Sequence, residues 1–456
     1  MKKSLVTLAV LAATGAFAQS SVTLYGIVEG TADIGYSRQQ DATATLNTFN
    51  AAGALTGSST TSSSSSTKNN LRVQDGSDQG TGTSRIGFRG TEDLGGGLKA
   101  NFQLEMGLRL DDGCTTLTST GGCDNGGNSA NSGGSTFGRN AWGGLSGGFG
   151  EVRVGRQVLG SFGVQANSES SGAALGLYNP SSSAFAPTVM GGTTRFSNAI
   201  KYITPNFGGF SANVAISAPE TGAVPTSTSS TTAGVVSTTN ASRRTGVDLA
   251  LEYANGPAYI GFGYNKRDTG NVTSFATPVV GGVSSGNTAP GTATGYTIGG
   301  AYDLGVVKPF VNYTRVKTST NSLVANSATA TSTATAGDIN ARGLSIGLRA
   351  PVGPFTVIAG YGRFNVTTDA SSSALAGGVT TTSFGRGEEK RDAFQLGAQY
   401  ALSKRTLVET NYGYSKLRGN GTATATSNAP GAGSIVISGS SNDRISAFNV
   451  GLKHSF

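Results

Sequence analysis

The sequence is poor in the residues that build most enzyme and metal sites. Its 456 residues include 1 His, 2 Cys, 3 Met and 1 Trp, against 70 Gly. One His and two Cys cannot supply a His or Cys metal cluster. A Ser-His-Asp triad would have to use His454, almost at the C-terminus. We therefore predict that the chain is not an enzyme and needs no cofactor.

Long hydrophobic runs are also missing. After residue 18, no run of about 18 apolar residues occurs, so the sequence predicts no transmembrane helix. Glycine has about twice its usual share of roughly 7% but no three-residue period, which excludes collagen. Recurring blocks of aromatic and β-branched residues argue against wholesale disorder. The composition indicates an all-β chain, and in a membrane such a chain must form a closed barrel.

The first 18 residues have the pattern of a secretory signal peptide. Lys2 and Lys3 precede an apolar stretch, and Ala16 and Ala18 provide the small residues that signal peptidase requires. We expect the mature chain, 19–456, to begin at Gln19. Loss of the two lysines lowers the formal charge from +8 to +6. An exported chain is not expected to have nucleic acid as a partner.

The two cysteines, Cys114 and Cys123, lie in a segment rich in Gly, Ser, Thr and Asn. In an oxidising, exported context this pair predicts one local disulfide that constrains a loop. A redox-active pair is the weaker alternative, because the spacing is not Cys-x-x-Cys and no βαβ pattern surrounds it.

Period-two alternation runs along the chain. Residues 98–108 place Leu98, Phe102 and Met106 on one face and polar residues such as Gln103 and Glu105 on the other. Similar alternation occurs at 210–217, 247–253, 258–264, 391–400 and 448–456. Each of these segments predicts a strand with one apolar and one polar face.

The predicted connections alternate between short and long. Seven short turns are expected at 93–97, 146–150, 205–209, 255–257, 303–305, 351–354 and 402–405. Eight long polar loops are expected at 37–83, 109–135, 157–194, 218–244, 267–293, 318–340, 365–390 and 416–443. Fifteen connections imply a sixteen-stranded antiparallel transmembrane β-barrel, with short periplasmic turns and long extracellular loops. A soluble β-sandwich is the alternative, but its connections would not sort so cleanly by length.

Several motifs, in order, carry a family resemblance. They are SRIGFRGTEDLGGGLKANF at 84–102, AWGGLSGGFGEVRVGRQ at 141–157, NAIKYITPNFGGF at 198–210, and the terminal Phe456. Together they resemble the Gram-negative general porins, most closely the trimeric porins of β-proteobacteria. The resemblance implies a homotrimer in the outer membrane, a third long loop, 157–194, folded into the pore, and passive diffusion of small hydrophilic solutes.

The resemblance also implies partners. The expected ones are outer-membrane lipid and lipopolysaccharide, the outer-membrane assembly machinery and the diffusing solutes. In the family, a terminal aromatic residue such as Phe456 is the recognition signal for assembly. Two alternative functions remain. The long Ser/Thr-rich loops suggest a surface adhesin or interaction barrel, and a substrate-specific channel is the other alternative.

Alternation predicts which charges face the lumen. Ile86 and Phe88 suit the lipid side, which turns Arg85 inward. Trp142 suits the membrane side, which puts Arg139 inward, and Tyr25 suits the interfacial aromatic residues.

The sixth strand adds two further candidates. With Phe196, Ile200 and Tyr202 facing lipid, Arg195 and Lys201 face the lumen. Within the resemblance, Arg85, Arg139 and Lys201 match the basic ladder opposite the third loop, with Arg195 as an alternate. That loop carries a single acidic residue, Glu169. We therefore predict a net positive constriction that prefers anions.

Overall fold

The computed structural model describes fourteen segments of the chain. They are 21–75, 84–108, 110, 136–170, 194–218, 226–230, 235–239, 245–268, 273–276, 284–287, 291–326, 331–376, 379–427 and 433–456. The predicted signal peptide, 1–18, and the predicted disulfide between Cys114 and Cys123 lie outside the described residues. Among the described residues, no helix is long and apolar enough to cross a membrane.

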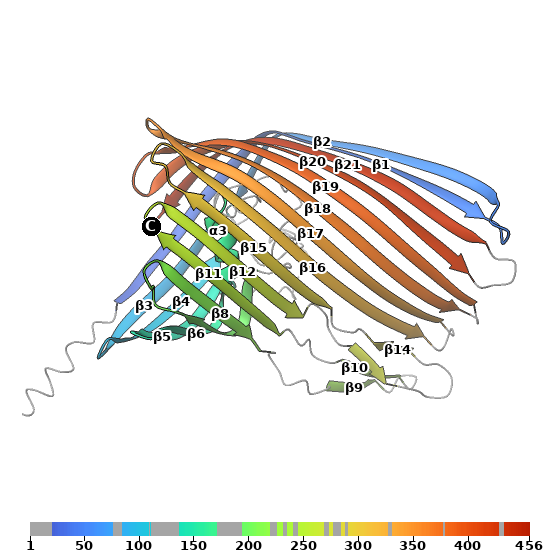
Figure 1. The fold of residues 1–456 in the computed structure, drawn as a ribbon, viewed down its shortest axis with the longest axis horizontal. Coiled ribbons are helices and arrows are strands. Elements are labelled where there is room, and N and C mark those ends of the chain that lie inside the picture. The colour runs from blue at the N-terminus through green and yellow to red at the C-terminus, as the bar shows by residue number, and fades with distance from the viewer. Residues whose placement is uncertain are drawn as a thin grey trace, which may run out of the picture.

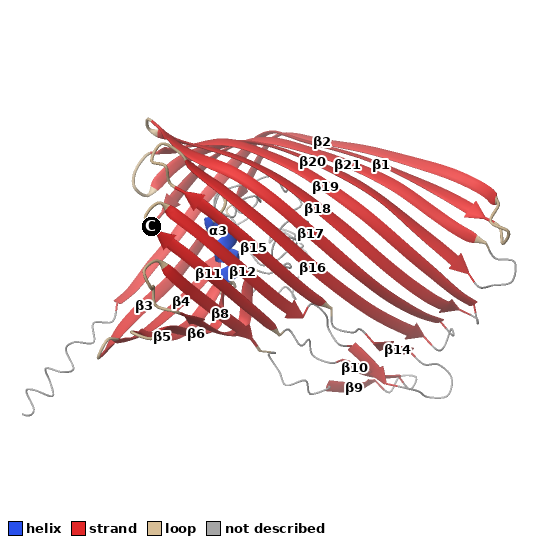
Figure 2. Ribbon diagram, in the orientation of Figure 1, coloured by secondary structure: helices blue, strands red, loops and turns tan. Residues whose placement is uncertain are grey.

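Sixteen antiparallel strands close into a barrel (Figures 1 and 2). They are β1 (Ser21–Phe49), β3 (Arg85–Gly95), β4 (Leu98–Gly107), β5 (Asn140–Gly147), β6 (Gly150–Val158), β7 (Arg195–Ile203), β8 (Phe210–Ser217), β11 (Gly246–Asn255), β12 (Ala258–Asp268), β15 (Thr292–Tyr302), β16 (Lys308–Asn326), β17 (Thr331–Val352), β18 (Phe355–Ala376), β19 (Val379–Ala401), β20 (Thr406–Ser427) and β21 (Ser434–Ser455). Each pairs with the next, and β21 returns to β1 in a register from Ile27↔Ser455 to Thr48↔Ile435. The predicted barrel and its strand number are confirmed.

Five further strands lie in segments that were expected to be loops. They are β2 (Leu55–Asp75), β9 (Thr226–Ser230), β10 (Val235–Thr239), β13 (Thr273–Ala276) and β14 (Ser284–Asn287). The expected loops at 37–83, 318–340, 365–390 and 416–443 are largely extensions of paired strands, drawn as the long ribbons of β1, β2 and β16 to β21 in Figure 1. These four loop assignments were wrong. We attribute the error to hydropathy, since Ser/Thr-rich strands with both faces polar carry no period-two signal.

The short turns occur where the sequence predicted them. Gly95, Gly96 and Gly97 have φ of 85°, 60° and 82°, and Gly256 and Gly353 have φ of 56° and 59°. Side chains are disfavoured in this left-handed region, so glycine is required for such tight reversals. The turns lie at one rim of the barrel, and the strand extensions lie at the other (Figure 1).

The barrel closes at its last residue. The Gly26 amide donates to the Phe456 carbonyl at 3.0 Å, and the Phe456 amide donates to the Gly26 carbonyl at 3.1 Å. The Phe456 ring covers Gly26, because a Cβ placed on that glycine would lie 2.3 Å from the ring Cζ. The C-terminal residue is thus the last rung of the seam between the first and last strands.

Deleting Phe456 should lower the yield of assembled trimer without altering export. The deletion removes both seam hydrogen bonds and the terminal ring, which the porin resemblance assigns to recognition by the assembly machinery. Phe456→Tyr keeps the ring and the backbone pair and is the matched control. Trimer and unassembled chain would be followed on semi-native gels during induction. Assembly of the deletion variant at the wild-type rate would contradict this role of the C-terminus.

Candidate functional site

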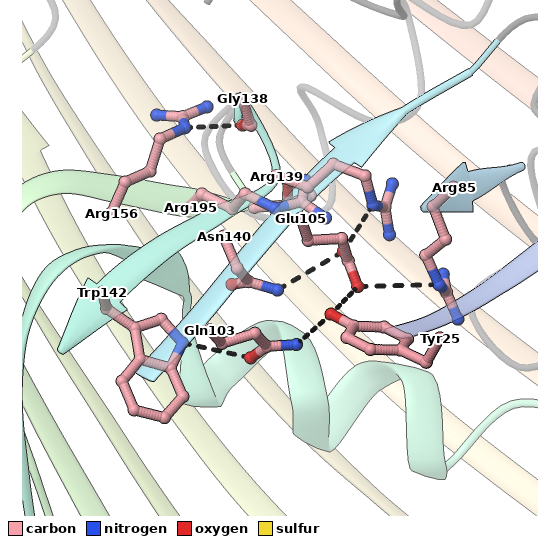
Figure 3. A network of polar contacts seen from close by, with 11 residues as sticks. Tyr25, Arg85, Gln103, Glu105, Gly138, Arg139, Asn140, Trp142, Arg156 and Arg195 are labelled. Carbon is pink, nitrogen blue, oxygen red and sulfur yellow. Dashed lines mark hydrogen bonds and ion pairs between the residues drawn. The ribbon is translucent and has the colours of Figure 1, made fainter. Parts of the chain in front are cut away.

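Inside the barrel, a carboxylate on β4 forms ion pairs with two arginines. Glu105 is 4% exposed, and its Oε1 accepts from Arg139 Nε at 2.6 Å. Arg85 Nε lies 3.7 Å from Glu105 Oε2, which also accepts from the Tyr25 hydroxyl at 2.9 Å. Figure 3 shows these side chains converging on Glu105 from β1, β3, β4 and the segment before β5. The structure therefore brings Arg85 and Arg139 together, around an acid that was not singled out as a site residue.

Hydrogen bonds between uncharged side chains extend this cluster along the barrel wall. Trp142 Nε1 donates to Gln103 Oε1 at 3.1 Å, and Gln103 Nε2 donates to the Tyr25 hydroxyl at 2.6 Å (Figure 3). Trp142 and Tyr25 consequently face the lumen, and their assignment to the membrane side was wrong. A buried Trp or Tyr is compatible with a polar lumen because its N–H or O–H finds a partner there.

Arg139 faces inward for a different reason than the one given by alternation. It precedes β5, and its backbone amide donates to the Glu105 carbonyl at 3.1 Å. Trp142 and Asn140 share the lumen side, so strict alternation would have put residue 139 outside. Because residue 139 lies before the strand, it is not bound by the alternation of the strand.

Two more arginines lie close to this cluster. Arg195 interacts electrostatically with Arg139, Glu105 and Arg156. Arg156 Nε donates to the Gly138 carbonyl at 2.6 Å, and its Nη1 donates to Ser197 Oγ at 2.6 Å. We call Arg85, Arg139, Arg156, Arg195 and Glu105 the arginine cluster. Sequence reasoning missed Glu105 and Arg156, although the position of Glu105 on the polar face of an alternating strand was a usable signal.

The start of β7 does not follow the predicted alternation. Phe196 is 5% exposed and packs with Leu159, Ala199 and Ala215, so its lipid-facing assignment was wrong. The cause is a register shift in the β6–β7 pairing between Gly155 and Gln157, together with a positive φ of 49° at Asn198. A bulge of this kind changes which face the following residues take.

Lys201 lies apart from the arginine cluster. It is 7% exposed, and its Nζ donates to the Val158 carbonyl at 3.1 Å. Its charged neighbours are Asp248, Arg153, Glu252 and Glu151. The structure therefore places Lys201 in contact with the start of the third loop, and not beside Arg85 and Arg139.

The third loop begins with a short helix inside the barrel, α3 (Gly160–Asn167) (Figure 1). Its N-cap residue, Leu159, has no side chain that could cap the first amides. Asp248 on β11 takes that role, because its Oδ2 accepts from the Gly160 amide at 2.7 Å and the Ser161 amide at 3.3 Å. The Ser161 hydroxyl donates to Asp248 Oδ1. A fully buried wall carboxylate thus satisfies the positive end of the helix.

The other end of α3 is also held by the wall. Ser168 Oγ accepts from Asn312 Nδ2 at 2.7 Å, and the Ser170 hydroxyl donates to the Ala359 carbonyl at 3.1 Å. Arg349 Nε donates to the Ser170 carbonyl. This close approach requires glycine on the wall, since a Cβ at Gly299 would lie 2.3 Å from Ser168 Oγ. The described start of the third loop is therefore anchored at both ends.

Glu169 does not project freely toward the arginine cluster. It is 5% exposed, lies against β16 to β18 near Phe310 and Gly347, and its Oε1 accepts from Gln165 Nε2 at 3.2 Å. Burial raises its pKa to about 7, so it is partly neutral at physiological pH. Among the described residues, Glu105 lies near Arg85, Arg139 and Arg195, and Glu29 is a further acidic neighbour of Arg85, so the four arginines of the cluster outnumber these two acids.

Comparison with known proteins gives the family. A protein-family model described as Gram-negative porin matches residues 5–420. The chain is 29% identical to outer membrane porin protein 32 of Delftia acidovorans over the full length of both, and 29% identical to an outer membrane porin protein of Bordetella pertussis, covering 91% of this chain and 94% of that protein. In structure it is similar to an anion-selective porin from Comamonas acidovorans, with a TM-score of 0.51, 25% identity and coverage of 96% of this chain and 100% of that one. The chain belongs to the Gram-negative porin family and is a β-barrel of the outer membrane.

Proposed function

We propose that the chain is a passive diffusion channel for small hydrophilic solutes that prefers anions. The observation that carries the proposal is the arginine cluster, where four guanidinium groups outnumber the nearby carboxylates of Glu105 and Glu29. Low-dielectric walls focus the field of such charges into the lumen, which raises the local concentration of anions. Glu169, being buried and partly neutral, offsets this charge little.

The relatives support this proposal. The similar structure from Comamonas acidovorans is described as an anion-selective porin. We further propose a homotrimer, as the porin resemblance implies, with the anchored α3 narrowing each barrel. The narrow zone would be lined by Arg85, Arg139 and Arg195. Arg156 would fix the backbone beside Arg139 through its hydrogen bond to the Gly138 carbonyl, and Lys201 would fix the start of the third loop through the Val158 carbonyl.

Purified protein added to a planar bilayer should give permanently open channels with conductance steps grouped in threes. An open barrel conducts without a trigger, and three pores enter the bilayer together in a trimer. Heat-dissociated chain is the control and should give no steps. Silent insertion would contradict the channel, and saturable flux blocked by one solute would instead indicate a substrate-specific channel.

A further inference from the structure

A hollow with a volume of about 610 Å³ lies on the strand extensions of β17 to β20. We call it the outer hollow. The strand register aligns its side chains in two adjacent rows. One row holds Asp338, Asp369, Arg386 and Thr422, and the next row holds Ser371 and Phe384. The volume falls in the range of roughly 300–1,000 Å³ that is usual for small-ligand sites.

Alternation fixes the face of the sheet on which the outer hollow lies. On β19, Leu396 is exposed, whereas its neighbour Gln395 is buried and faces the lumen. Phe384 and Arg386 lie an even number of residues from Leu396, and the pairing of β18 with β19 is unbroken between these positions. Both side chains therefore face outward, and Asp369, which is paired directly with Arg386, shares their face.

The outer hollow lies well beyond the membrane. Exposed aromatic residues such as Phe394 mark the membrane interface of outer-membrane barrels. Phe384 is ten residues farther from the short turns on the same strand, or roughly 33 Å along it. Strands tilted by about 35–45° still rise by more than about 20 Å over that length. The hollow is thus on the part of β17 to β20 that extends past the rim opposite the short turns (Figure 1).

The charges at the outer hollow nearly cancel. Asp338 is directly opposite Asp369, a like-charge pair that is destabilising on its own. Lys317 Nζ lies 3.5 Å from Asp338 Oδ2, and Arg386 Nε lies 3.7 Å from Asp369 Oδ1. Arg386 Nη2 is also 3.8 Å from Glu388 Oε1, so three acids face two basic groups, a net charge of −1. These ion pairs are longer than hydrogen bonds, which leaves carboxylate acceptors and guanidinium donors available to a ligand.

Phe384 provides an apolar surface beside these polar groups. Its side chain is 60% exposed. On either side it is paired with a residue that carries a hydroxyl, Ser371 on β18 and Thr424 on β20. The outer hollow therefore combines an exposed aromatic ring, hydroxyls, acceptors and donors on one face.

We propose that the outer hollow binds an uncharged sugar residue of an extracellular polysaccharide. A sugar hydroxyl both donates and accepts hydrogen bonds, which fits a site where carboxylates, a guanidinium and hydroxyls are side by side. The C–H groups of a sugar ring are slightly positive and fit the negative face of an aromatic ring. The net negative charge disfavours phosphorylated or sulfated ligands. A cationic ligand would have to displace Lys317 or Arg386 from the acids, so a neutral ligand is favoured.

The test measures binding of soluble polysaccharides to the purified protein in a detergent without a sugar headgroup. Immobilised protein would be titrated with dextran, mannan and galactan, and the wild type should bind at least one of them saturably. F384A should weaken that binding about fivefold or more, as expected for loss of an aromatic contact. F384Y keeps the ring and should restore most of the binding. The matched control is F207A, which removes an equally exposed ring near the short turns.

Charge provides the second arm. D369N should also weaken binding, and the sulfated form of the bound polysaccharide should bind more weakly than the uncharged form. Tighter binding of the sulfated form would overturn the proposal, and so would competition by polylysine but not by the free sugar, which would indicate a cationic ligand.

The variants also separate sugar binding from the channel. Because Phe384 faces away from the lumen, F384A should conduct with wild-type conductance and reversal potential, which shows that its barrel is intact. Absence of saturable binding to all three polysaccharides, or equal binding by F384A and wild type, would overturn the sugar site and leave the channel standing.

Discussion

Channels carrying Arg139→Glu are expected to lose their preference for chloride over potassium in dilute KCl. The substitution changes the charge of the arginine cluster by two units at the residue closest to Glu105, whose Oε1 lies 2.6 Å from Arg139 Nε. Two unit charges about 8 Å apart at an effective dielectric of roughly 20 interact by about 2 kcal/mol, enough to alter ion partitioning several-fold. The reversal potential across a KCl gradient measures the effect. Arg85→Glu should act in the same direction.

Salt and position provide the controls for this selectivity. The Debye length falls from about 8 Å at 0.15 M to about 3 Å at 1 M, so the anion preference of the wild type should fade in molar KCl. Lys317→Glu makes the same charge change on the outward face of β16, where Lys317 is 3.5 Å from Asp338, and should alter the reversal potential much less. Glu105→Gln should strengthen the anion preference. A wild-type channel that prefers potassium in dilute salt would refute the assignment of these arginines to the constriction.

Asp248→Ala is expected to make the pore current noisy and to raise its mean conductance. The change removes the wall carboxylate that accepts from the first two amides of α3, and it deprives the buried Lys201 of an acidic neighbour. Loss of a helix cap costs about 1 kcal/mol, and removal of a buried partner adds to that. Since α3 is short, we expect it to leave the wall for part of the time. Single-channel recordings at fixed voltage measure the flicker.

Graded substitutions separate loop anchoring from simple loss of charge. Asp248→Asn keeps an oxygen acceptor for the Gly160 amide and should flicker less than the alanine variant. Asp303→Ala removes a carboxylate that accepts from the Gly305 amide in a short turn, and should leave the current quiet. A steady, wild-type current in Asp248→Ala would show that α3 is held by its other contacts, those of Ser168 and Ser170.

Much of the barrel could be predicted because its wall separates lipid from water. Residues such as Phe394 and Leu396 face outward while Gln395 faces inward, and this period of two repeats wherever a strand crosses the membrane. Glycine-rich turns such as 93–97 then mark every second reversal. The same signal fails beyond the membrane, where β1 and β2 pair along Ser/Thr-rich stretches that have water on both faces.

The candidate site was only partly predictable, because it depends on local departures from alternation. Arg139 points inward since it precedes its strand, and Phe196 is buried since a register shift changes the face it takes. Trp142 lies in the lumen because Gln103, on the neighbouring strand, accepts its N–H. The hydropathy pattern of a single strand does not show which residues of the neighbouring strands its side chains will contact.

The sequence by itself determined the sixteen-stranded barrel, the places of its turns and the family. These follow from periodic hydropathy and local turn chemistry, which are properties of neighbouring residues. Only the tertiary structure decided that Glu105 joins Arg85 to Arg139 and that Asp248 caps α3. Each of these depends on strand register and on contacts between residues far apart in the chain, which hydrogen-bond pairing around the closed barrel sets as a whole.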